Sequence, residues 1–206
     1  MNNNAITGIS ATILLGCIIL IAGVAGSVVM NNSEEEVGQY EQILDNAYNE
    51  ITNYIQVKHI VGKYSYINGE KQIEKIAILI KPLFTNNIDT TEFIINLNNG
   101  KQIKILSNSE QTEFIHSNSL FNHPLWDNMR GAGFSIIAIH DKDRSIIDYN
   151  TLNHNTDMAY IIIKFTEELT MRKGDTMTIS IIPSTGVIKT IAIEATLPMQ
   201  NIVDLY

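Results

Sequence analysis

Hydrophobic side chains dominate the start of the chain, and no charged residue occurs before Glu34. Isoleucine, leucine, valine, alanine and glycine make up most of the segment from Ala5 to Met30. As a helix, this segment is long enough to cross a bilayer core of about 30 Å. Such a segment cannot remain exposed to water, so it must be buried in lipid or against other copies of itself.

The hydrophobic pattern continues as a helical one beyond Glu34. Apolar residues recur at spacings of three and four, at Val37, Tyr40, Leu44, Ala47, Ile51, Tyr54 or Ile55, Val57 and Val61. This spacing is typical of an amphipathic helix, and no proline interrupts it. We therefore predict one continuous helix of about 55 residues, on the order of 80 Å long. A single domain cannot bury a helix of this length, so its length implies burial by partners.

After Gly62 the pattern changes to that of β-strands, with apolar and polar residues alternating in several runs. We predict strands over residues 73–82, 93–97, 102–106, 134–140, 159–166, 176–183 and 187–195. Turn residues separate them, notably Asn68-Gly69 and Asn98-Asn99-Gly100. Residues 108–133 are predicted to be a long connection with little regular structure. The predicted fold is α+β, with a long hydrophobic helix over residues 1–61 and one β-sandwich domain over residues 62–206.

Small residues follow one face of the apolar helix in steps of four. They are Gly8, Thr12 and Gly16, followed by Ala22 and Gly26. Small side chains let apolar helices approach closely, which favours helix packing over a solitary lipid anchor. The alternative is that such residues are simply common in membrane helices. We predict that helices assemble through these five positions together with Ile13, Leu20 and Val24.

Charge argues against one class of function, and the cysteine content excludes an intramolecular disulfide. The net charge of −8 argues against nucleic-acid binding, which needs clustered lysine and arginine. Cys17 is the single cysteine, so no intramolecular disulfide can form. Residues 1–4 lack the lysine or arginine of a conventional signal peptide, and the first basic residue is Lys58. We expect either that a basic leader has been removed or that membrane insertion is unusual.

The polar residues indicate no catalytic constellation. The five histidines do not lie at metal-ligand spacing with one another or with acidic residues. There is no glycine-rich phosphate loop and no Gly-x-Ser-x-Gly motif. We therefore expect a protein that is not an enzyme.

Two short motifs could carry a metal ion or a sugar. Asp141, Asp143 and Ser145 present oxygen side chains at alternating positions, as at the start of a Ca²⁺ loop, but the glycine and the bidentate glutamate of a full loop are missing. A plain solvated hairpin is the alternative. Asn31 begins the chain's Asn-x-Ser sequon, although a sugar there would crowd helix packing. Trp126 is expected to pack in a core or an interface.

Several segments resemble a known family, and they occur in the same order along the chain. They are Ala5–Ile9, Ala25–Val29, Asn31–Ser33, Phe134–Ile136, Asp141–Ser145, Gly174–Ile179, Ile182–Gly186 and Leu197-Pro198. Together they resemble archaellins, the filament subunits of the archaellum with which archaea swim. No single motif is specific, and the resemblance depends on their order.

The resemblance implies a type IV pilin-like structural subunit of an extracellular filament. In this arrangement the N-terminal helix packs into the filament core as a homo-polymer, and an immunoglobulin-like β-sandwich faces outward. The resemblance also implies a transient membrane stage, a prepilin-type peptidase that removes a basic leader, and an archaellum motor. A second related subunit could co-polymerise.

Two other functions fit the same sequence pattern. One is a membrane-anchored extracytoplasmic β-sandwich that binds a partner, such as an archaellum accessory protein or an adhesin. The other is a subunit of a non-rotating adhesive pilus. The anchored module predicts monomers that stay in membranes, whereas both filament hypotheses predict polymers.

Overall fold

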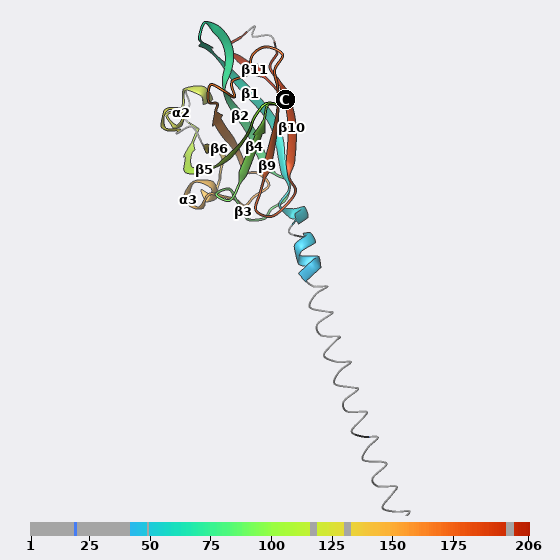
Figure 1. The fold of residues 1–206 in the computed structure, drawn as a ribbon. Helices are drawn as coiled ribbons and strands as arrows, with labels where there is room; N and C mark the ends of the chain where they lie inside the picture. Colours follow the sequence, from blue (N-terminus) through green and yellow to red (C-terminus); the bar gives the residue numbers. More distant parts are fainter. Residues whose placement is uncertain (1–18, 20–41, 49, 116–118, 130–132, 197–199) are drawn as a thin grey trace, which may run out of the picture. The chain divides into compact units, whose positions relative to one another are not determined.

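The computed structural model describes residues 19, 42–48, 50–115, 119–129, 133–196 and 200–206 (Figure 1). The chain divides into two compact units, residues 1–48 and residues 49–206. In the first unit Ile19 and residues 42–48 are helical, and their side chains are exposed. Within the described residues, no helix combines the length and the apolar composition needed to cross a bilayer. Most of the helix predicted over residues 1–61 lies outside the described residues, because residues 1–18 and 20–41 are not among them.

The last part of the predicted helix is wrong, because strand β1 (Ile55–Ile67) begins at Ile55. The pairing of β1 with β2 (Glu70–Pro82) shifts register between Val57 and His59. Buried residues therefore fall at Ile55, Val57 and Ile60, with a three-residue step across the irregularity. A strand with such a bulge reproduces the spacing of a helix over one turn. Val57 belongs to the core, whereas Val61 packs on the other face of the sheet, so apolar residues on both faces produced the four-residue step that extended the predicted helix to Val61.

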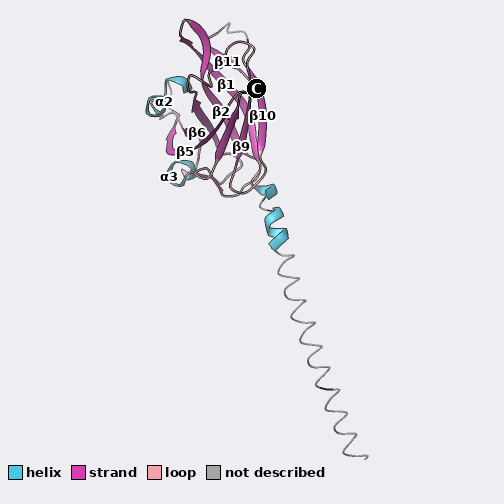
Figure 2. Ribbon diagram, in the orientation of Figure 1, coloured by secondary structure: helices cyan, strands magenta, loops and turns pink. Residues whose placement is uncertain are grey.

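The second unit is mostly β and is built on one curled sheet of nine strands (Figure 2). Its order is β10-β9-β4-β5-β6-β8-β2-β1-β11. The further strands are β4 (Ile94–Asn98), β5 (Ile103–Phe114), β6 (Gly133–His140), β8 (Met158–Lys164), β9 (Thr176–Ile182), β10 (Lys189–Glu194) and β11 (Ile202–Asp204). Strands β5 and β6 pair in parallel, and the other neighbours pair antiparallel. Two short strands, β3 (Ile88–Asp89) and β7 (Thr151–Leu152), pair separately.

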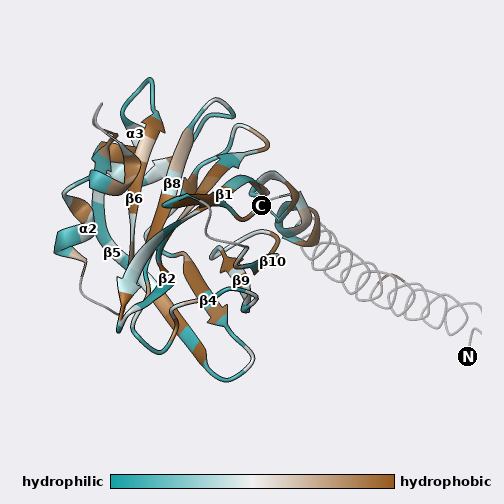
Figure 3. Cartoon of the chain, turned by 90° about the horizontal axis from the view of Figure 1, so that it is seen from above, coloured by the Kyte–Doolittle hydropathy of each residue, from teal (hydrophilic) through white to brown (hydrophobic). Residues whose placement is uncertain are grey.

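The curl of the sheet encloses one hydrophobic core. Ile55 and Ile60 from β1 belong to the same buried cluster as Ile191 and Ile193 from β10, near the opposite edge of the sheet. Figure 3 shows hydrophobic segments along β2, β4 and β6, with mostly hydrophilic turns between strands. Burial alternates along β9 and β10, as the period-two pattern predicted, whereas β2, β6 and β8 have consecutive buried residues on both faces.

A second apolar cluster covers the outer face of β2, β6 and β8. The 3₁₀ turn η1 (Leu120–Asn122) and helix α2 (Leu125–Asn128) supply Phe121, Leu125 and Trp126, which pack on Ala77, Ile137 and Ile162. The Trp126 indole Nε1 donates to the Leu120 carbonyl at 2.8 Å, and its ring stacks on Phe121. The expected packing role of Trp126 is confirmed. The expectation of little regular structure over residues 108–133 needs correction, since β5, η1 and α2 lie there.

Candidate metal centre

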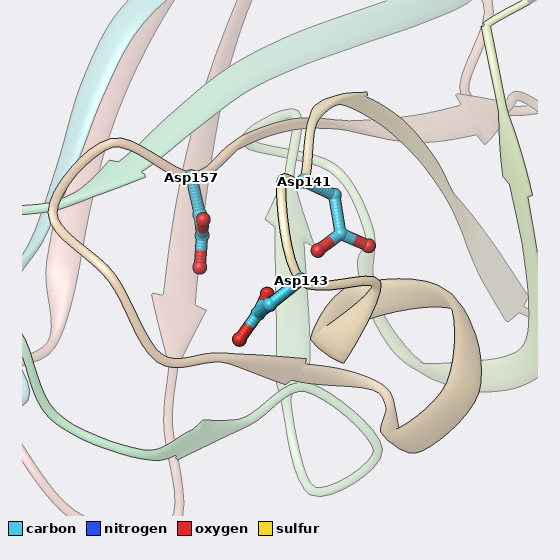
Figure 4. Close-up of side chains that lie close together, drawn as sticks. All are labelled: Asp141, Asp143 and Asp157. Carbon is cyan, nitrogen blue, oxygen red and sulfur yellow. The ribbon is translucent and has the colours of Figure 1, made fainter.

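Three carboxylates lie close together between the end of β6 and the start of β8 (Figure 4). Asp141 follows the last residue of β6, and Asp143 lies in the turn before helix α3 (Ser145–Tyr149). Asp157 immediately precedes β8. One oxygen of each carboxylate lies within 4.8 Å of the corresponding oxygens of the other two. This spacing allows one small cation to contact all three.

The turn before α3 is folded around the first two carboxylates. Asp141 Oδ2 accepts the backbone N–H groups of Ile146 at 3.1 Å and Ile147 at 3.2 Å, in the first turn of α3. Asp143 Oδ1 accepts the Ser145 N–H at 3.2 Å. Arg144 between them adopts a left-handed backbone with φ of 65°. The carboxylates thus satisfy N–H groups that a helix start leaves without partners.

Asp157 is fully buried and organises the loop before β8. Its Oδ2 accepts the backbone N–H groups of Asn153 at 3.0 Å and His154 at 2.8 Å. The other oxygens, Oδ1 of Asp157 and Oδ1 of Asp141, are buried and accept no hydrogen bond from any described residue. A buried acceptor without a partner is costly. These two oxygens are therefore acceptors still open to a further ligand such as a cation.

The environments of Asp141 and Asp143 shift their pKa values in opposite directions. Burial raises the pKa of Asp141, and the two N–H donors of α3 only partly offset this. The side-chain amide of Asn153, 2.6 Å from Asp143 Oδ2, lowers the pKa of Asp143 to about 2. Asp143 therefore remains charged at any physiological pH. Oxygen ligands of this kind suit a hard cation such as Ca²⁺ or Mg²⁺.

The structure brings two of the three predicted ligands, Asp141 and Asp143, together with Asp157. Ser145 donates its hydroxyl to Asn153 Oδ1 at 3.0 Å. Sequence reasoning missed Asp157 because no spacing rule connects it with Asp141. The available signal was its position directly before a predicted buried strand.

The other predicted functional residues lie outside the described residues. These are the assembly positions Gly8, Thr12, Ile13, Gly16, Leu20, Ala22, Val24 and Gly26, and the candidate glycosylation site Asn31. They remain predictions.

A sequence comparison and a structure comparison both find archaeal flagellins among the proteins similar to this chain. No family model matches the chain. The chain is 28% identical over 163 residues to Flagellin B3 of Methanocaldococcus jannaschii, covering 76% of this chain and 73% of that protein. The described fold is similar to the crystal structure of archaeal flagellin FlaB1 from the same organism, with a TM-score of 0.64 and 18% identity over 73% of this chain and 95% of that one. It is also similar to the archaeal flagellum of Methanospirillum hungatei strain JF1, with a TM-score of 0.63 and 13% identity over 96% of this chain and 98% of that one.

Proposed function

We propose that this chain is a structural, non-enzymatic subunit of the archaellum filament at the cell surface, on the basis of its similarity to the archaeal flagellins, or archaellins. The observation that carries this function is the sequence match with Flagellin B3, which includes most of both chains. The shared fold is consistent with it. The filament is a homo-polymer of such subunits and serves swimming motility.

The finer proposal divides the chain into an assembly helix and an outer domain. The helix runs from the start of the chain to about Thr52 and bundles with copies of itself, while the β domain forms the filament surface as an immunoglobulin-like sandwich. Exposed apolar side chains in the described part of the helix support this. Ile43, Leu44 and Tyr48 are 61%, 68% and 66% exposed, which a helix without partners would not favour.

Substitutions in the helix test this division. Gly16→Leu fills a predicted close approach and Val24→Asp places a charge in the apolar bundle, so each should abolish filaments while the β domain still folds. Gly16→Ala is the matched control, because it keeps a small side chain. Electron microscopy of sheared filaments and circular dichroism of the subunits supply the two readouts. Filaments that form normally from both variants would refute the helix core.

The proposal also includes steps before and during assembly. The apolar segment spans the membrane transiently, a prepilin-type peptidase removes a basic leader, and the archaellum motor turns the finished filament. A filament that also contains a second related subunit is the alternative to the homo-polymer. Intact-mass measurement of purified filaments gives the mature N-terminus and reports whether Asn31 carries a sugar.

We further propose that Asp141, Asp143 and Asp157 bind a structural Ca²⁺ ion. The two partnerless buried oxygens support this, because a divalent cation would satisfy both and reduce repulsion among three carboxylates. Ca²⁺ that binds only the folded protein should raise stability by about 2.7 kcal/mol at a hundredfold excess over Kd.

Thermal unfolding with added CaCl₂ or EDTA tests the metal site. We expect Ca²⁺ to raise the Tm of the wild type and not that of Asp143→Ala or Asp157→Asn. Asp148→Asn is the control, since Asp148 pairs with Arg144 at 3.0 Å and is not part of the cluster. An unchanged wild-type Tm, or an equal rise in all variants, would exclude the site.

A further inference from the structure

Three lysines lie directly opposite one another across three neighbouring strands. Lys63 on β1 pairs with Lys75 on β2, and Lys75 pairs with Lys164 on β8. Ala77 and Ile162, two residues away on the same strands, belong to the outer apolar cluster. Because side chains two residues apart share a face, the three lysines lie on the outside of the sheet. We name Lys63, Lys75 and Lys164 the lysine row.

The lysine row is unfavourable within one subunit. Like charges placed opposite each other on adjacent strands destabilise a sheet. Burial lowers the pKa of Lys75, and the charges of Lys164 and Lys63 lower it further against the opposing effect of Glu74. Lys164 forms an ion pair with Glu74 at 3.6 Å. Among the described residues, neither Lys63 nor Lys75 has an ion-pair partner.

Apolar side chains lie next to two of the three lysines. The Lys75 ammonium lies 5.2 Å from the centre of the Trp126 ring. Ile202 on β11 lies opposite Lys63 and is 46% exposed. An apolar border limits the access of water to an ion pair formed at the row and so strengthens it. This combination is typical of a protein contact surface rather than of a fully solvated strand.

The charge of the β domain indicates what this surface contacts. Residues 49–206 hold 17 acidic and 14 basic residues, so the β domains of two copies, each with a net charge of −3, repel one another. The two lysines of the row that have no ion-pair partner among the described residues, Lys63 and Lys75, are complementary to carboxylates of another copy. Such a contact offsets both the repulsion between subunits and the repulsion within the row.

On the premise of the proposed filament function, we propose that the lysine row binds carboxylates of a second copy of this chain, as a lateral contact between outer domains. Assembly through this contact depends on salt, because ions screen exposed charges beyond about 10 Å at 0.1 M. Subunits in the filament then pair charges that are unpaired in the free subunit.

The test compares the full-length wild type with the double variant Lys63→Met/Lys75→Met. Methionine keeps the aliphatic length of Lys75 over Trp126 and removes the charge. The control Lys101→Met/Lys173→Met removes the same charge from two exposed lysines outside the row. Two readouts are needed: the Tm of depolymerised subunits, and the critical concentration for filament assembly at low and high NaCl.

We expect the row variant to have a higher subunit Tm than the wild type and a critical concentration raised about tenfold or more at low salt. Its assembly should also depend less on NaCl. The control should assemble like the wild type. A contribution to folding alone would change the Tm and leave assembly unchanged, which would overturn the proposal.

Two other outcomes would show that the row binds a different partner or that the proposed filament function is wrong. If wild-type filaments form and both double variants assemble normally, but only the row variant loses binding to vesicles of phosphatidylcholine and phosphatidylglycerol, the row binds an anionic membrane and a second copy is excluded. If the wild type itself forms no filaments, the proposed filament function fails, and this inference fails with it.

Discussion

At the scale of single residues, Gly186 lies against the backbone of Asn53. A Cβ atom at Gly186 would lie 2.9 Å from both the Cβ and the carbonyl oxygen of Asn53, and the φ angle of Gly186 is +118°. Asn53 is buried and donates to Thr185 Oγ1 at 2.6 Å, and its Oδ1 accepts from the Asn86 amide at 2.6 Å. These contacts fix the residues before β1 to the turns after β2 and β9.

Gly186→Ala should therefore destabilise the β domain by about 3 kcal/mol, from the strained backbone and the overlap with Asn53. Gly69→Ala is the matched control, since Gly69 has φ of +84° and a Cβ atom added there would meet no other atom within 4 Å. It should cost about 1 kcal/mol. Urea unfolding measures both, and equal losses would show that the contact with Asn53 is unimportant.

The pKa of Asp143 predicts a pH dependence. A carboxyl whose pKa is lower in the folded protein stabilises the fold above its unfolded pKa, and this contribution is lost as pH falls. For Asp143 the loss lies between about pH 4, the unfolded value, and its folded pKa of about 2. Asp141 has the opposite sign, because its raised pKa makes the folded protein lose stability as pH rises above about 4.

Asn153→Ala removes the amide that holds the Asp143 pKa down. In EDTA, the urea midpoint of this variant should fall less between pH 4 and pH 2 than that of the wild type. The difference should vanish when both proteins also carry Asp143→Asn. Parallel pH profiles for wild type and Asn153→Ala would contradict the assigned hydrogen bond.

At the scale of elements, the segment of residues 119–129 acts as a cover over the outer face of the sheet. Trp126 is 1% exposed and holds this segment by packing and by its bond to the Leu120 carbonyl. The cover depends on one side chain more than on its short helix, because α2 has only four residues.

Trp126→Ala should destabilise the β domain by about 3–5 kcal/mol through lost packing. Trp126→Phe should cost about 1–3 kcal/mol, since a ring remains on Phe121 but the Leu120 carbonyl loses its donor. Tyr149→Ala, at a side chain that is 75% exposed, should change stability by less than about 0.5 kcal/mol. Urea midpoints decide the order, and a Phe variant as unstable as the Ala variant would contradict it.

Local sequence signals predicted the strands and turns well where no irregularity intervened. The Asn98-Asn99-Gly100 turn forms as expected, with Gly100 at φ of +81° and its N–H bonded to Asn98 Oδ1. The start of β1 was missed because Val57 and Val61, which pack on opposite faces of the sheet, are spaced like residues of a helix. Asp157 was missed because its approach to Asp141 is created by the pairing of β6 with β8, which local patterns do not contain.

At the scale of the whole molecule, the sequence combines an uncharged apolar start with an acidic β domain. The first requires partners for burial, and the second repels other copies unless opposite charges are placed at contacts. In the proposed filament, neighbouring copies of the chain would meet both requirements. The central claim is therefore that copies of this chain polymerise through their N-terminal helices.

Electron cryo-microscopy of filaments sheared from cells tests that claim most directly. The account predicts side-chain density that fits this chain, with residues from Ala5 to about Thr52 in a bundled helical core and the β domain outside. A cell-surface filament that does not contain this chain, with the chain retained as monomers in the membrane fraction, would contradict the account.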